Sequence, residues 1–222
     1  MPNYDPQPPV FRVATLTLGP LDTNCYLLAD AESGEAAAID PADDAPAILR
    51  LARREGWSIR HILLTHGHFD HIGGLAELKR LTDARVAIHP KDAAMLESAH
   101  LCGAALFGMP FSPCPADRHI RGGEFAELGR ARIQALETPG HTPGGLSYYI
   151  GSAAQGIVCS GDALFYSSVG RTDLPGGDGA ALQRSIRETL FALPAATRVL
   201  PGHGPETSIG REMRENPYVR AR

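Results

Sequence analysis

Three histidines and an aspartate crowd into one short stretch of the chain, LLTHGHFDHIGG at residues 63–74. His66, His68, Asp70 and His71 carry imidazole and carboxylate groups, which suit borderline divalent ions such as Zn²⁺, with Fe and Mn as alternatives. They follow an apolar run, so we expect a loop at the end of a buried strand. A solvated polar loop is the alternative, and the regular spacing of four ligand-type residues argues against it.

Three further ligand-type residues also come directly after predicted strands. His141 follows RIQALETPG, Asp162 follows GIVCSG, and His203 follows TRVLPG. Taken singly, each would be read as a helix cap or an ordinary loop residue. A glycine precedes each of them, however, and glycine lets the backbone approach its neighbours closely. Because functional groups converge in loops beyond strand ends, we expect these residues to meet the loop at 63–74.

Seven ligand-type residues are more than one tetrahedral ion needs. Divided between two ions about 3.5–4 Å apart, they give three histidines to one ion, an aspartate and two histidines to the other, and one carboxylate to bridge. The set therefore predicts a dinuclear centre with open positions for water.

The elements that must position these residues are short strands interspersed with helices. Strands are predicted over residues 10–19, 24–30, 35–40, 60–66, 85–89, 131–141, 145–151, 156–162 and 197–203, and helices over 43–56, 73–83, 90–99 and 179–193. Residues 100–117 show no clear periodicity and much Pro and Gly, which indicates a long loop with a functional role. Two packed sheets with helices outside them form the layered architecture that we expect.

Length and composition exclude several classes of protein. The 222 residues, 43% hydrophobic and 21% charged, predict a single α/β domain over residues 1–222. A net charge of −4 with dispersed Lys and Arg gives no footprint for nucleic acid. No signal-type N-terminus or membrane-length apolar run is present, so we expect a cytoplasmic protein without a membrane partner. The four cysteines are far apart and should be reduced.

The sequence THGHFDH resembles the HxHxDH signature of the metallo-β-lactamase superfamily, and the resemblance extends over nearly the whole chain. It implies an αββα four-layer sandwich that binds one or two metal ions at one edge. By position, the resemblance assigns the first ion to His66, His68 and His141, the second to Asp70, His71 and His203, and the bridge to Asp162. All seven positions are filled.

Two other stretches, GRTDLPGGD and PGHGPETSIGREMRENPY, look most like short bacterial relatives of hydroxyacylglutathione hydrolase, the glyoxalase II group. This implies hydrolysis of a thioester such as S-D-lactoylglutathione by a hydroxide held between two metal ions, with Asp70 and Asp162 as the catalytic carboxylates. Only 19 residues follow His203, so we expect no counterpart of the helical domain with which long glyoxalase II enzymes hold glutathione. Thr172 and Asp173 also replace the aromatic residues that follow the basic position in those enzymes.

The roles of some residues stay open. Arg171 either binds a substrate carboxylate or pairs with Asp173 in its own loop. Asp40 either orients a ligand histidine or shapes a turn with Pro41. In the loop at 100–117, three apolar side chains either wall a pocket or pack the loop onto the core: Phe107, Met109 and Phe111.

Other reactions of the same fold are alternatives to thioester hydrolysis. Persulfide dioxygenases resemble this chain too, and their single iron uses the positions of His66, His141 and Asp162. Lactone hydrolysis is a further possibility. The redox module of flavodiiron proteins carries a carboxylate where this chain has His68, which counts against it.

Overall fold

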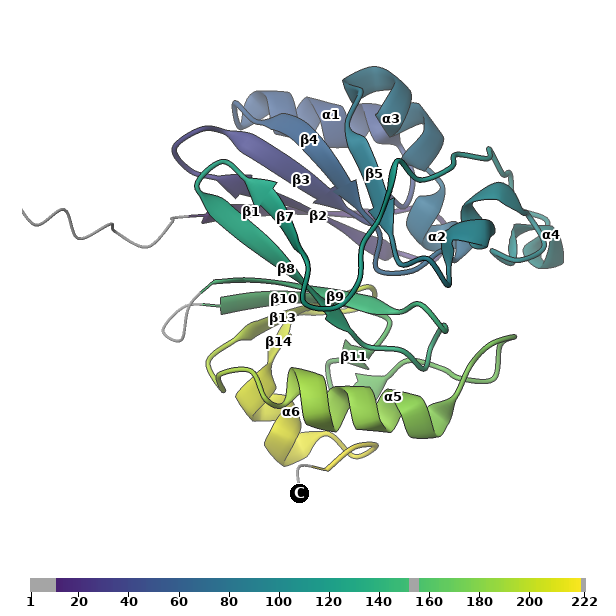
Figure 1. The fold of residues 1–222 in the computed structure, drawn as a ribbon, viewed down its shortest axis with the longest axis vertical. Coiled ribbons are helices and arrows are strands. Elements are labelled where there is room, and N and C mark those ends of the chain that lie inside the picture. Colours follow the sequence, from purple (N-terminus) through teal and green to yellow (C-terminus); the bar gives the residue numbers. More distant parts are fainter. Residues whose placement is uncertain (1–10, 152–155, 221–222) are drawn as a thin grey trace, which may run out of the picture.

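The computed structural model describes residues 11–151 and 156–220, which fold into four layers in the order helix, sheet, sheet, helix (Figure 1). The first sheet has the strand order β1 (Phe11–Leu18), β2 (Thr23–Asp30), β3 (Glu35–Ile39), β4 (Ser58–Leu63), β5 (Arg85–Ile88), β6 (Arg118–His119). The first three strands pair antiparallel, and β3 to β6 run parallel.

The second sheet has the order β14 (Thr207–Ser208), β13 (Arg198–Pro201), β10 (Gly156–Gly161), β9 (Leu146–Gly151), β8 (Ala131–Glu137), β7 (Phe125–Leu128). Strands β8 and β10 both lie antiparallel to β9, and β13 lies parallel to β10. The carboxyl ends of β8, β10 and β13 therefore lie at the same edge of the sheet. This is the edge that the sequence predicts for His141, Asp162 and His203.

Helices cover the outer face of each sheet (Figure 1). Helices α1 (Ala45–Arg54) and α3 (Leu75–Thr82) lie on the first sheet, and α5 (Gly179–Ser185) and α6 (Ile209–Glu215) on the second. A π-helical turn, η2 (Ile186–Leu190), continues α5. The smaller elements are α2 (Phe69–Ile72), the 3₁₀ helix η1 (Ala93–Glu97), α4 (Ala104–Phe107) and the hairpin of β11 (Leu164–Phe165) with β12 (Ser168–Val169).

Three hydrophobic cores fill the three spaces between the layers. Alternate residues of β2 separate the first two cores: Cys25 and Leu27 face α1 and α3, whereas Tyr26 and Leu28 face the second sheet. The third core joins the second sheet to α5 and α6. Because β2 is buried on both faces, its sequence is an almost unbroken apolar run. This packing holds the strand ends rigid beneath the candidate site.

The fold confirms the predicted layers and corrects some elements. The predicted helix over 90–99 is only the short 3₁₀ helix η1, and the predicted loop at 100–117 contains α4. Strands β6, β7 and β14 and helix α6 were not predicted. Residues 1–10 lie outside the described residues. They include the first residue of the strand predicted over 10–19 and the start of the segment in which a targeting signal would lie. None of the described helices has the length and apolar character needed to cross a membrane.

Candidate metal centre

The seven side chains predicted as ligands lie together at one edge of the sandwich. The ligand atoms of His66, His68 and His141 lie within 4.8 Å of one another, and so do those of Asp70, His71 and His203. These two clusters have the same membership as the two ligand sets that the family resemblance assigns.

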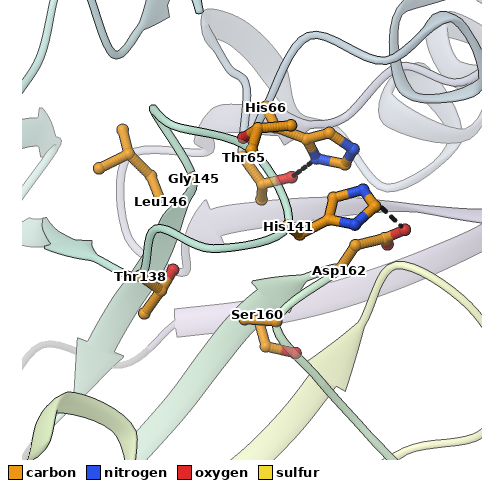
Figure 2. A pocket seen from close by; sticks show the side chains of 10 residues that line it. Thr65, His66, Thr138, His141, Gly145, Leu146, Ser160 and Asp162 are labelled. Atoms are coloured by element: carbon orange, nitrogen blue, oxygen red, sulfur yellow. Dashed lines mark hydrogen bonds and ion pairs between the residues drawn. The ribbon is translucent and has the colours of Figure 1, made fainter. Parts of the chain in front are cut away.

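Asp162 lies between the two clusters. Its Oδ1 is 3.3 Å from Nε2 of His71, and its Oδ2 is 3.5 Å from Nε2 of His141. The carboxylate therefore faces one histidine of each cluster, as a bridging ligand must. Figure 2 shows His141 and Asp162 in contact, with the ring of His66 beside them.

Backbone carbonyls hold two of the histidine rings by the nitrogen that faces away from the centre. Nδ1 of His141 lies 2.7 Å from the carbonyl oxygen of Arg171, and Nδ1 of His203 lies 3.1 Å from that of Leu21. A carbonyl can only accept, so each Nδ1 donates its proton. In the neutral ring the lone pair is then on Nε2, which faces the centre: Nε2 of His141 lies 2.9 Å from Nδ1 of His68, and Nε2 of His203 lies 3.2 Å from Oδ2 of Asp70.

Asp40 holds the histidine-rich loop from behind. Its carboxylate accepts hydrogen bonds from the amide and hydroxyl of Thr65, at 2.7 and 2.6 Å, and from Nδ1 of His71 at 2.9 Å. The Thr65 hydroxyl in turn lies 3.0 Å from Nδ1 of His66 (Figure 2). The ligand atoms of Asp40, His66 and His71 also lie within 4.8 Å of one another. Because protein donors occupy the Asp40 oxygens, we assign Asp40 to orienting the ring of His71.

At the centre, the buried Nε2 of His66 has no hydrogen-bond partner among the described residues, and Nε2 of His71 and Oδ1 of Asp162 lie 3.3 Å apart without making a well-aligned hydrogen bond. An unsatisfied buried polar atom costs about 1–3 kcal/mol, so native structures rarely leave several together. Imidazole nitrogens and a carboxylate oxygen form a donor set that divalent metal ions prefer. The residues present therefore fit a metal centre.

Burial and local charge shift the pKa values of these groups in opposite directions. Burial, assisted by neighbouring imidazoles, lowers the pKa of His66 well below its usual value and that of His68 to about 4. Both rings are neutral at pH 7, as a metal ligand must be. Burial also opposes the charged form of His71, but Asp70 and Asp162 outweigh it and raise the pKa of His71 well above its usual value. The second cluster thus attracts positive charge, from a proton or from a cation.

Glycines allow the loops to approach this closely. A Cβ added to Gly202 would overlap Oδ1 of Asp162 and lie 2.7 Å from Cε1 of His71. Gly161 has a φ of +49°, and a Cβ there would lie 2.6 Å from Cβ of Thr65. The glycine before Asp162 and the glycine before His203 are therefore required by the packing of the loops around the centre.

The structure places the residues for which the sequence left two roles open, Arg171 and the three apolar residues of the 100–117 loop. Arg171 lines the cavity at the centre, but its guanidinium binds both carboxylate oxygens of Asp173, at 2.7 and 2.8 Å. A substrate contact by Arg171 stays a prediction. Met109 and Phe111 pack against the first core, whereas Phe107 lines the cavity and is 52% exposed.

Asp92 supports the centre although the sequence reading did not single it out. This buried carboxylate accepts hydrogen bonds from the Thr142 hydroxyl at 2.6 Å and from the Gly144 amide at 2.7 Å. It thereby holds the loop that carries His141. The sequence could have pointed to Asp92, because this residue comes just after the strand predicted over 85–89, and the other site residues also follow predicted strands.

The metallo-β-lactamase superfamily profile matches residues 18–203, from the end of β1 to the last predicted ligand. The chain belongs to this superfamily. Its relatives include a probable metallo-hydrolase, YqgX, of Bacillus subtilis, 38% identical over 92% of this chain and 95% of that protein. The hydroxyacylglutathione hydrolase GloC of Haemophilus influenzae is 35% identical over 90% of this chain and 93% of its own length.

Solved structures of the superfamily share the whole fold. The B3 metallo-β-lactamase BLEG-1 superposes with a TM-score of 0.87 at 40% identity, over 94% of this chain and 99% of that one. The structure of TTHA1623 in a di-iron-bound form superposes with a TM-score of 0.82 at 42% identity, over 93% of this chain and 100% of that one. ETHE1 from Myxococcus xanthus superposes with a TM-score of 0.78 at 31% identity, over 94% of this chain and 83% of that one. The chain thus has the metallo-β-lactamase fold, with the His and Asp clusters of a metal centre.

Proposed function

We propose that this protein is a metal-dependent hydrolase that cleaves a thioester, such as S-D-lactoylglutathione, to a hydroxy acid and a free thiol. The observation that carries the proposal is the position of Asp162 between two clusters of three ligand-type residues beside a cavity. Similarity to a hydroxyacylglutathione hydrolase over nine-tenths of the chain supports the choice of substrate class.

The proposed cofactors are two divalent ions, Zn²⁺ first, with Fe or Mn as alternatives. His66, His68 and His141 would hold one ion, Asp70, His71 and His203 the other, and Asp162 would bridge them. When bound, the ions would lower the pKa of water toward about 7 and polarise the thioester carbonyl.

The chain's own groups orient this chemistry. Thr23 donates a hydrogen bond from its hydroxyl to Oδ2 of Asp70 at 3.2 Å, and Asp40 fixes the proton of His71 on Nδ1. Both carboxylates proposed as catalytic, Asp70 and Asp162, are thus held on the cavity wall. A thiol leaving group has a pKa of about 8.5, so it departs as a thiolate without a dedicated general acid.

The same proposal covers the partners of the protein. We infer a small-molecule substrate in the cytoplasm, with Arg171 near its carboxylates, and a single domain over residues 1–222. The net charge of −4 offers no attraction to nucleic acid.

Hydrolysis of S-D-lactoylglutathione, followed by absorbance, tests the proposal. We expect turnover that a chelator removes and added Zn²⁺ or Mn²⁺ restores. Elemental analysis of protein purified without added metal should find two ions per chain. Protein with both ions bound but no thioesterase activity would refute the thioester assignment.

An iron-dependent persulfide dioxygenase is the second candidate. The three positions that such an enzyme uses, His66, His141 and Asp162, converge here, and the buried Nε2 of His66 has no hydrogen-bond partner among the described residues. Oxygen uptake with glutathione persulfide and one iron per chain would favour this candidate. Two ions and hydrolysis without oxygen uptake would exclude it.

A further inference from the structure

A cavity of about 690 Å³ opens directly onto the candidate metal centre. Five of the seven predicted ligands line it: His68, Asp70, His141, Asp162 and His203. The rest of the wall comes from Leu21, Phe69, and side chains within residues 91–107 and 142–175. Any substrate that reaches the centre must therefore lie against these segments.

The wall of the cavity is unusually apolar for a solvent-exposed surface. Of the six large hydrophobic side chains that are exposed in the described residues, four line this one cavity: Leu21, Leu101, Leu106 and Phe107. Leu106 is 74% exposed and Leu101 57%. Single exposed apolar residues are ordinary, but a group of them around one concave site marks a binding surface for an apolar group.

The apolar side chains are held in place relative to the centre. The ring of Phe107 packs on that of Phe69, with centroids 5.2 Å apart, and Phe69 lies inside the histidine-rich motif. The amide of Phe69 donates to the carbonyl oxygen of Cys102 at 2.9 Å, which ties the segment before α4 to the same motif. The apolar wall is thus a fixed part of the site.

Apart from the five predicted ligands, the wall carries five polar side chains: Lys91, Asp92, His100, Thr142 and Arg171. Three of them are engaged within the protein. Asp92 binds Thr142, and Arg171 binds Asp173. Lys91 is the one cationic side chain of the described lining residues that makes no ion pair. A wall of this kind offers few partners to a highly polar acyl group such as lactoyl, because each desolvated hydroxyl needs a hydrogen bond.

We propose that the cavity binds an apolar acyl group, aliphatic or aromatic, and that Leu101, Leu106 and Phe107 select thioesters that carry one. This inference rests on the proposed thioesterase function of the same centre. In the reaction, water adds its oxygen to the acyl carbon and the carbon–sulfur bond breaks. The sulfur leaves with the bonding pair and takes up one proton, and the acid loses its proton to become a carboxylate.

A chain-length series tests the inference on the metal-loaded protein. The substrates are the acetyl, butanoyl and hexanoyl thioesters of glutathione together with S-D-lactoylglutathione, and kcat/KM is measured for each. Burial of each added methylene should raise kcat/KM about four-fold. Equal values across the series, or a preference for the lactoyl thioester over hexanoyl, would overturn the inference while leaving the thioesterase function intact.

Leu106→Ala is the informative variant, because Leu106 is exposed and alanine preserves the helical turn of α4. We expect the ratio of hexanoyl to acetyl kcat/KM to fall about ten-fold. Tyr218→Ala is the matched control: Tyr218 is 60% exposed but does not line the cavity, so the ratio should not change. An unchanged ratio in Leu106→Ala would contradict the role given to this side chain.

Binding of thioethers separates this inference from the reaction itself. S-methylglutathione and S-hexylglutathione cannot be hydrolysed, and calorimetry gives their Kd values directly. We expect the hexyl compound to bind more tightly, and Leu106→Ala to reduce the difference. Tighter binding of the hexyl compound without turnover of any thioester would refute the thioesterase function alone, whereas equal Kd values would refute the apolar site.

Discussion

Gly202 is the residue at which a single methyl group should damage the metal centre. In Gly202→Ala the new Cβ would overlap Asp162 and crowd His71, which belong to the bridge and to the second cluster. We expect affinity for the second ion to fall at least ten-fold, because moving the loop also moves His203. Metal content after dialysis, measured by elemental analysis, checks this.

Gly204→Ala is the matched control in the same loop. Gly204 has a φ of +74°, so alanine there is strained by about 1–2 kcal/mol, but no atom lies within 4 Å of the added Cβ. This variant should lose stability and keep both ions. If Gly202→Ala kept two ions at unchanged affinity, the close packing around Asp162 would not matter for binding.

Asp40 should influence the centre through the ring of His71. In Asp40→Asn an NH₂ group replaces one carboxylate oxygen, and an NH₂ group cannot accept the hydrogen bonds that Thr65 and His71 now give to Oδ2. Asparagine tolerates the positive φ of 49° at this position. We expect metal affinity to fall about 10–100-fold, measured by competition with a chelator.

Asp30→Asn is the control for loss of a buried carboxylate elsewhere. Asp30 ends β2 and accepts hydrogen bonds from the amide and hydroxyl of Ser33. This change should lower stability without altering metal affinity. Equal metal affinity in Asp40→Asn and the unmodified protein would show that His71 does not need the hydrogen bond to Asp40 in order to bind metal.

At the scale of elements, Asp117 fastens the end of the 100–117 loop to α3 and β5. Its carboxylate accepts hydrogen bonds from Nζ of Lys79 at 2.6 Å and from the amide of Val86 at 2.8 Å. Burial acts to raise the pKa of Asp117, but these two donors outweigh it and lower the pKa. The stabilisation is therefore present above the unfolded-state pKa of about 3.9 and is lost as the pH falls through the folded value.

We expect Asp117→Asn to lower the free energy of unfolding by less than about 1 kcal/mol at pH 7, because the ion pair is partly exposed. The difference from the unmodified protein should shrink as the pH falls below the unfolded-state pKa of about 3.9 and disappear once Asp117 is protonated in the folded protein. Urea unfolding at pH 7 and over a series of acidic pH values measures it. Thr82→Ala, which removes the hydrogen bond from the Thr82 hydroxyl to the Leu78 carbonyl oxygen at the end of α3, is the control, because threonine does not ionise and the effect should be the same at each pH. In Asp117→Asn, a difference that persists at low pH would contradict the assigned cause.

Elements with a clear pattern in their own sequence were the ones that could be predicted. Strands β2 and β10 read as apolar runs because the cores on their two sides demand it. β6 has only two residues and owes its existence to pairing with β5, which no local pattern reports. The segment at 90–99 has helical spacing, but Asp92 turns its carboxylate to Thr142 and Gly144 instead of capping a helix.

In the candidate site, too, the residues that belong to a sequence pattern could be predicted, and those that depend on tertiary contacts could not. Seven residues of ligand type stood beyond predicted strands, so their chemistry and their convergence were both accessible from the sequence. Asp92 could not be given a role, because its hydrogen bonds depend on how η1 lies against the loop after β8. The apolar wall of the cavity was left undecided for the same reason, since α4 contacts Phe69 only in the folded chain.

At the scale of the whole molecule, the centre connects the two halves of the sandwich. His66, His68, Asp70 and His71 follow β4 of the first sheet, whereas His141, Asp162 and His203 follow strands of the second. Each cluster takes ligands from both halves. Metal binding should therefore favour only the conformation in which the two sheets are packed together.

We therefore expect bound metal to stabilise the protein as a unit. At free metal about 100-fold above Kd, binding adds about 2.7 kcal/mol to the free energy of unfolding, which corresponds to about 5–10 °C in Tm for a chain of this length. Calorimetry with and without chelator measures the shift. In Asp162→Ala the shift should shrink, because each cluster loses the carboxylate that it shares. A full shift in that variant would mean that the two clusters bind metal independently and that Asp162 does not bridge them.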